Sequence, residues 1–213
     1  MDTVFGIEVD RAFGSVADLR EEAKAASRFV NNKVIDHIDA LAARFIAASP
    51  LAFLATRRPD GGLDMTPRGD PAGFVHILDE KTLALPDRPG NFRMDAFENI
   101  LETGEAALIF VIPGHGDTLR VSGKAKVVRD AALGERLAIS GRPAAYVTLI
   151  RVERVLSHCP KAFVRGRIWQ PDHWPDRSGV PTLAEMMVAH SDLPDPVEEV
   201  EEIVKRDGET RLY

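Results

Sequence analysis

About seven short apolar segments follow one another along the middle of the chain, and most of the links between them are of hairpin length. Parallel strands need crossovers of a dozen or more residues, whereas antiparallel strands can be joined by tight turns. The spacing therefore predicts a mainly β fold with a six- to seven-stranded antiparallel sheet. Such a sheet usually closes into a barrel or stacks as a sandwich, and we favour a barrel flanked by helices. The predicted strands are residues 51–56, 63–69, 74–79, 82–86, 106–112, 118–128 and 144–156.

Helical patterns flank this region on both sides. Apolar residues recur at three- and four-residue spacing between 18 and 48, which predicts two helices with a break near 31–33. Proline and glycine are expected to interrupt the second strand at Pro67 and Gly69. Further helices are expected at 158–169, 182–190 and 196–206. We interpret residues 1–213 as a single domain, with a helical extension at about 15–48, a barrel at about 50–157 and a C-terminal helical segment at about 158–213.

Composition is that of a soluble globular protein, with 45% hydrophobic and 28% charged residues. The net charge of -6 argues against nucleic-acid binding. The single cysteine, Cys159, cannot form an internal disulfide and is expected to be buried. The first residues lack the features of a signal peptide, and no apolar run is long enough to span a bilayer, so a cytoplasmic location is expected.

Several common catalytic sites have no support in the sequence. There is no P-loop, no G-x-G-x-x-G after a strand and no G-x-S-x-G elbow. The six histidines never adopt a tight metal-ligand spacing, so no metal site is expected. These observations disfavour a nucleotide-hydrolysing, Rossmann-type or serine-hydrolase function.

Three arginines stand beside glycines and prolines, at positions where the backbone is irregular. Arg68 lies in "MTPRGDP", and Arg88 and Arg93 lie in "LPDRPGNFR", where Asn91 is expected to cap a helix. One interpretation is a phosphate site, because guanidinium forks and a helix N-terminus both favour a phosphate monoester. The alternative is a set of ordinary salt bridges to the nearby residues Asp64, Asp70 and Asp87.

A family resemblance adds to this pattern. The motifs "PRGDP", "LPDRPGN", "NIL", "TLRVSG" and "CPKA" with a following Trp169 resemble the pyridoxamine 5′-phosphate oxidase-like, FMN-binding split-barrel proteins over roughly residues 50–170. The resemblance implies a homodimer of split barrels with FMN held in the grooves between subunits. It also implies a cofactor site shared by the two chains.

The same resemblance assigns residues to the cofactor. It implies that Arg93 grips the FMN phosphate next to Asn91, and that Arg68 also reaches the phosphate. Residues Met65, Thr66 and Pro67 would edge the ring and ribityl chain, while Pro86, Asp87 and Arg88 would border the ring. Thr118 corresponds to a flavin contact from the partner chain, and Lys161, Arg165 and Trp169 lie in a segment that folds back on the groove.

The resemblance favours an FMN-dependent oxidoreductase with a small-molecule substrate. The histidine-and-arginine motif with which the parent oxidase reads its substrate has no convincing equivalent in "HWPDRSGV", so the substrate and the catalytic residues stay unassigned. Two alternatives stay open. One is an FMN-binding protein without turnover, such as a flavin store, sensor or electron carrier, and the other is a related barrel that holds haem or the deazaflavin F420.

Overall fold

The computed structural model describes all 213 residues and divides into two compact units, Met1–Val34 and Ile35–Tyr213. The first unit contains an antiparallel hairpin and two short helices, and none of its residues is buried. The hairpin was not predicted from the sequence. The elements of this unit are β1 (Asp2–Val4), β2 (Ile7–Val9), α1 (Val16–Glu22) and α2 (Arg28–Asn32).

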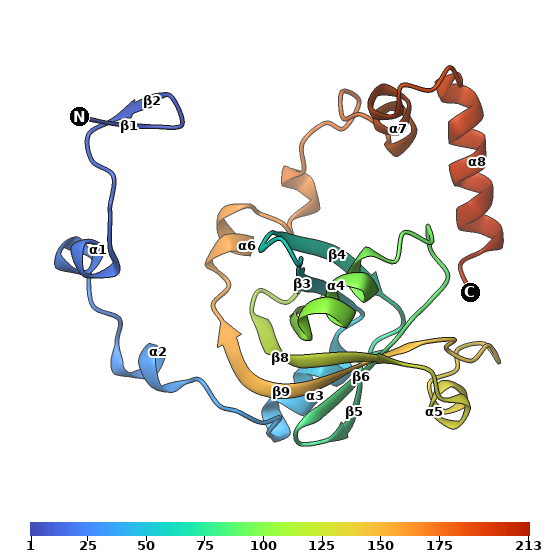
Figure 1. Cartoon of the computed structure of the whole chain (residues 1–213), viewed down its shortest axis with the longest axis horizontal. Coiled ribbons are helices and arrows are strands. Elements are labelled where there is room, and N and C mark those ends of the chain that lie inside the picture. Colours follow the sequence, from blue (N-terminus) through green and yellow to red (C-terminus); the bar gives the residue numbers. More distant parts are fainter. The chain divides into compact units, whose positions relative to one another are not determined.

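The second unit is built on one seven-stranded antiparallel sheet, which confirms the predicted fold class. The strands lie in the order β4-β3-β7-β8-β9-β6-β5 (Figure 1). All seven predicted strands are present, with shifts of up to three residues at their ends. They are β3 (Leu51–Arg57), β4 (Leu63–Gly69), β5 (His76–Asp79), β6 (Thr82–Pro86), β7 (Glu105–Val111), β8 (Thr118–Val128) and β9 (Val147–His158).

The two outer strands, β4 and β5, do not pair with each other, so the sheet is not closed. They are nevertheless consecutive in the chain, joined by the short link 70–75, which can span at most about 20 Å. This link draws the two edges of the sheet toward each other. The result is a rolled sheet with an open seam between its first and last strands.

The hydrophobic core lies inside this curved sheet, under two helices. α3 (Ala40–Ala48) contacts β8, and α4 (Asp95–Thr103) lies against β3 and β4 (Figure 1). In β3 every second side chain is buried, as expected for a strand with one face in the core. The largest fully buried side chains include Phe110, Ile46 and Leu54.

Polar contacts also fasten α4 to the sheet. Buried Asn99 donates through Nδ2 to Thr56 Oγ1 at 3.0 Å, and Thr103 Oγ1 donates to the carbonyl of Arg57 at 3.1 Å. If the helix moved away from the sheet, these buried polar groups would lose their hydrogen-bond partners, which costs free energy. The middle and the end of α4 are therefore fixed relative to β3.

The remaining helices are peripheral. α7 begins with a complete capping box, in which Thr182 and Glu185 satisfy each other's backbone N–H groups, and it contacts α8. No helix combines the length and the hydropathy that a membrane span requires. These elements are α5 (Ala131–Arg136), α6 (Lys161–Arg165), the 3₁₀ helix η1 (Pro171–His173), α7 (Leu183–Ser191) and α8 (Val197–Thr210).

Several local predictions were wrong. The region 18–48 holds three helices, and Ile35 forms an isolated bridge with Val155 before α3 begins. α6 is shorter than the predicted helix 158–169. β4 continues through Pro67, because an edge strand has a free side on which a missing N–H costs no hydrogen bond. Cys159 is exposed because it follows the end of β9.

Candidate functional site

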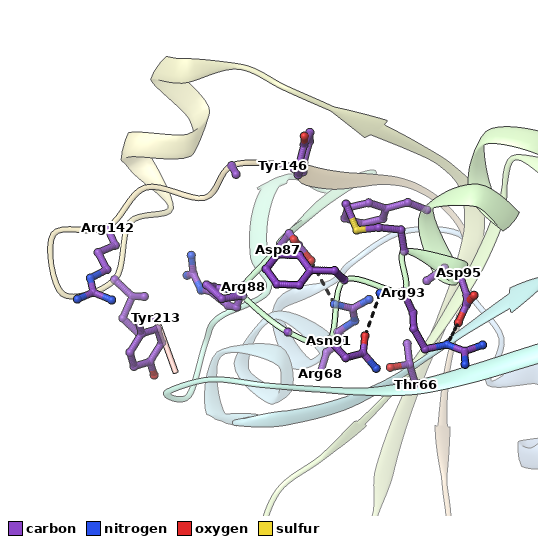
Figure 2. A pocket seen from close by; sticks show the side chains of 18 of the residues that line it. Thr66, Arg68, Asp87, Arg88, Asn91, Arg93, Asp95, Arg142, Tyr146 and Tyr213 are labelled. Carbon is purple, nitrogen blue, oxygen red and sulfur yellow. Dashed lines mark hydrogen bonds and ion pairs between the residues drawn. The ribbon is translucent and has the colours of Figure 1, made fainter. Parts of the chain in front are cut away.

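A pocket of about 750 Å³ lies beside the open seam of the sheet, between β4 and the loop that follows β6. It is lined by β4, by the loop that links β6 to α4, by the start of α4 and by the loop before β9 (Figure 2). Its volume falls within the range of small-molecule and cofactor sites. Of the residues predicted to contact a cofactor, those that line the pocket are Met65, Thr66, Arg68, Asp87, Arg88, Asn91 and Arg93.

Two ion pairs join β4 and its following residue to the residues after β6. In one pair the arginine is on the β4 side, and in the other the arginine is on the β6 side. Arg68 from β4 donates to Asp87 at 3.2 Å, beyond the end of β6, and Arg88 donates through Nε to Asp70 at 2.7 Å. The Asp70 side chain is only 1% exposed, so this is a buried pair and not a surface salt bridge. Arg88 also donates through Nη2 to the carbonyl of Leu137 at 2.9 Å.

The guanidinium groups of Arg88 and Arg68 differ in how many of their nitrogens already have hydrogen-bond partners. Arg88 has partners on both Nε and Nη2, so it ties the loop in place. Arg68 keeps a buried Nε with no hydrogen-bond partner. A buried donor of this kind is rare in native proteins and indicates a place where a further acceptor would be favourable.

The third arginine lies in a short irregular segment. Asn91 Oδ1 accepts a hydrogen bond from the Arg93 backbone N–H at 3.1 Å, which makes an Asx turn. Arg93 Nε donates to Asp95 at 2.7 Å, and 73% of the Arg93 side chain is exposed. The nearby residues Phe92 and Met94 have φ of 58° and 60°, values that are unfavourable for side chains with a Cβ.

The helix start differs from the prediction. α4 begins at Asp95 after Met94, so Asn91 is not its cap and Arg93 precedes its first turn. Asp95 and Glu98 occupy that turn and match the positive end of the helix dipole, as is usual. The arginines are therefore not placed at the helix N-terminus, but they line the pocket beside it.

Charges inside the pocket influence each other. Burial raises the pKa of the Asp87 carboxyl, an effect that neighbouring Arg68 opposes. The hydrogen bond and charge of Asp95 raise the pKa of the Arg93 guanidinium, and Asp64 adds to the effect. Four arginines and three aspartates line the pocket, and Asp70, the partner of Arg88, brings the aspartates to four, so the charges of the site balance.

Comparison with known proteins identifies the family. The family described as pyridoxamine 5′-phosphate oxidase matches residues 38–159, which is more than half of the chain. The chain belongs to the pyridoxamine 5′-phosphate oxidase family. No curated protein sequence matches it significantly.

Solved structures of similar proteins match a little more than half of this chain. A protein from Lactobacillus delbrueckii described as a putative pyridoxamine 5′-phosphate oxidase is 25% identical, covers 57% of this chain and 95% of its own, and has a TM-score of 0.46. HupZ from Group A Streptococcus is 21% identical, with 55% and 91% covered and a TM-score of 0.44. An FMN-binding protein from Syntrophomonas wolfei is 12% identical, with 54% and 82% covered and a TM-score of 0.42.

Other predicted site residues of this pyridoxamine 5′-phosphate oxidase family member lie outside the pocket lining. Pro67 is on β4 but does not line it, and Pro86 is buried at the end of β6 opposite Val147. Thr118 is buried at the start of β8. Lys161 and Arg165 are exposed on α6. Pro67 and Pro86 adjoin lining residues along the chain, whereas Thr118, Lys161 and Arg165 do not line the pocket with the other seven.

Trp169 belongs to a separate aromatic contact in this family member. Its indole N–H donates to the His115 carbonyl at 2.8 Å, and its ring stacks on Phe163 with centroids 5.6 Å apart. These contacts fix the segment after α6 against the turn between β7 and β8. They explain the position of Trp169 without a cofactor.

Sequence reasoning missed part of the pocket wall. Tyr146 lines the pocket, its carbonyl accepts from Asp87 N–H at 2.9 Å, and its ring meets Phe97 edge-on at 5.9 Å. Arg142 lines it from the loop before β9 and forms no ion pair. Tyr213 lines it from the far end of the chain. No local sequence signal pointed to these residues, because they reach the pocket only through the tertiary fold.

Proposed function

We propose that the protein is an FMN-dependent oxidoreductase that binds the flavin in the seam pocket. The observation that carries the proposal is the buried, unpartnered Nε of Arg68 in a pocket that the exposed side chain of Arg93 also lines. Membership of the pyridoxamine 5′-phosphate oxidase family supports the same cofactor. When bound, the isoalloxazine ring would supply the redox chemistry.

The residues fit the phosphate end of FMN. An exposed pair such as Arg93 with Asp95 contributes little stability, so a phosphate can replace the carboxylate on Arg93 at small cost. Arg68 would offer its free Nε. Arg88 would stay bound to Asp70 and Leu137 and hold the loop, while the ring-bordering role that the family resemblance implies for it stays a prediction.

The residues also fit the ring of FMN. Phe92, Phe97 and Tyr146 line the pocket with aromatic surface, and Met65 adds an apolar side chain on β4. Flat aromatic groups and a ring system attract each other by stacking and by edge-to-face contact. The apolar surface would orient the ring and shield it from water.

We further propose that the protein is a homodimer in which the partner chain completes each pocket. Thr118, Lys161, Arg165 and Trp169 lie outside the pocket of their own chain, yet the family resemblance assigns them to the cofactor groove. A pocket at an open seam has one side that its own sheet does not cover. A second copy would supply that wall.

A second candidate function is a flavin carrier or store without turnover. No histidine, cysteine, lysine or glutamate lines the pocket, and of its aspartates Asp87 and Asp95 are already paired with arginines, which leaves few free groups for proton transfer. Aerobic oxidation of NADH or NADPH by the purified yellow protein would support the oxidoreductase. A bound flavin that neither nicotinamide reduces would support the carrier.

The test of the flavin site is the replacement Arg93→Glu. It removes a phosphate contact and adds a negative charge, so co-purified FMN should fall by at least about tenfold, since a hydrogen bond to a charged group is worth about 1.5–3 kcal/mol. Flavin absorbance of the purified protein measures the loss. Arg206→Glu makes the same charge change on α8 outside the pocket, and should leave the spectrum unchanged. An unchanged spectrum for Arg93→Glu would contradict the assignment.

A further inference from the structure

The loop 88–93 crosses the pocket with little backbone support. It lies between β6 and α4, and its N–H groups bond only to neighbouring side chains, that of Arg88 to Asp87 and that of Arg93 to Asn91. Only one of its carbonyls accepts a hydrogen bond, and the donor comes from outside the loop. The Gly90 carbonyl accepts from Arg211 Nη2 at 3.1 Å.

The segment 211–213, which follows α8, makes two further contacts around this loop. The guanidinium carbon of Arg211 lies 4.8 Å from the centroid of the Phe92 ring, a cation–π distance. Tyr213 donates its hydroxyl hydrogen to Asp70 Oδ1 at 2.8 Å. Asp70 Oδ2 is the acceptor of Arg88, so one aspartate joins Tyr213 to the first residue of the loop.

The segment therefore supports three residues of the loop, Gly90 and Phe92 directly and Arg88 through Asp70. Figure 2 shows Tyr213 at the end of the pocket beside Arg142, with Arg88 between it and Arg68. The ring of Tyr213 is itself part of the pocket wall. Without these contacts, the backbone from Pro89 to Phe92 would have no hydrogen bond to the rest of the protein.

We propose that Arg211 and Tyr213 are positioning residues, which hold the loop 88–93 in the shape that binds the phosphate end of the ligand. The proposal rests on the proposed function, because FMN is the ligand whose phosphate this loop would meet. A loop already held in its bound shape loses less conformational entropy on binding. The segment thus sets affinity for the phosphorylated ligand through the shape of the loop.

The first test measures ligand discrimination in the full-length protein after removal of bound flavin. Arg211→Ala should weaken FMN binding by about tenfold and riboflavin binding by no more than about twofold, because only FMN carries the phosphate. Arg211→Lys keeps the charge and a donor, and should restore most of the FMN affinity. Arg206→Ala removes an arginine from α8 outside the pocket and should behave as the unaltered protein. Tyr213→Phe keeps the ring, loses the bond to Asp70 and should weaken FMN selectively.

The second test observes the loop without any flavin. Phe92 is 72% exposed, so chymotrypsin can cut after it, and Arg211→Ala should speed that cut several-fold relative to Arg206→Ala, as followed by mass spectrometry. Unchanged cleavage, or equal loss of FMN and riboflavin affinity, would overturn the positioning role. Failure of the unaltered protein to bind FMN would instead overturn the proposed function, and the cleavage assay would still decide whether the segment holds the loop.

Discussion

At the scale of single residues, three arginines reach one pocket but differ in how much of each guanidinium is already bound. Arg88 has a buried carboxylate and a carbonyl as partners, Arg68 has one carboxylate and a free buried Nε, and Arg93 has one exposed carboxylate. Buried, fully bonded groups resist rearrangement, whereas exposed pairs exchange partners easily. The three arginines are therefore suited to different tasks, although their sequence contexts look alike.

Arg68→Ala tests the free Nε. We expect FMN to lose more affinity than riboflavin, because the lost donor would face the phosphate. Asp87 would also lose its partner while half-buried, so the free energy of unfolding should fall by about 1–3 kcal/mol. Calorimetric titration with both flavins gives the two affinities, and Arg68→Lys separates charge from fork geometry. An equal loss for FMN and riboflavin would remove Arg68 from the phosphate site.

His76 on β5 gives a pH prediction. Burial, followed by the charges of Arg136 and Arg88, lowers the pKa of His76 below its usual 6.5. The unfolded chain therefore binds a proton at a higher pH than the folded chain does. The stability that depends on neutral His76 is present above pH 6.5 and is lost as the pH falls toward the folded pKa. Urea midpoints measured from about pH 7.5 to 5 should fall for the unaltered protein and fall less for His76→Gln. Parallel curves would contradict this role.

At the scale of elements, the strands were predictable because alternation and tight links are local properties of the sequence. The start of α4 was not predictable, since Asn91 looks like a cap, whereas the backbone passes through positive φ at Phe92 and Met94 first. Side chains with a Cβ rarely adopt such values, and only the tertiary structure holds them there. The arginines of the pocket were found because they share special local contexts, but Tyr213 and Arg142 are brought there by chain segments far from the motif.

The pairing of β8 with β9 depends on Gly123. The register between these strands shifts between Ser122 and Gly123, and a Cβ at Gly123 would lie 1.9 Å from the Arg151 carbonyl oxygen. Gly123→Ala should therefore force the two central strands apart and lower the free energy of unfolding by about 3 kcal/mol. Gly208→Ala is the matched control, because nothing lies within 4 Å of that position in α8 and alanine favours helix. Urea denaturation of both variants measures the difference. Equal midpoints would contradict the prediction, because they would show that β9 can shift to make room for the added methyl group.

At the scale of the whole molecule, the seam pocket and the residues around α6 make sense together if two chains share each site. The fold of one chain could be anticipated from its strands, but a site divided between chains leaves no local pattern in one sequence. In a site of that kind, residues such as Arg93 and Arg165 would look unrelated until a partner is considered. The open edge of the sheet gives a physical reason for such a partner, because unpaired edges and half-open pockets leave surface that a second copy can cover.

A mixed dimer tests this shared site. Arg93→Glu would disable the pocket of its own chain, and Arg165→Glu would disable the wall that its chain lends to the partner. Each variant alone should lose FMN. A heterodimer of the two, isolated with two different affinity tags, would pair one intact pocket with one intact wall and should recover one FMN per dimer. If every site were built from a single chain, both sites of the heterodimer would be defective and no flavin would return. Flavin absorbance of the doubly purified dimer therefore separates a shared site from a site within one chain.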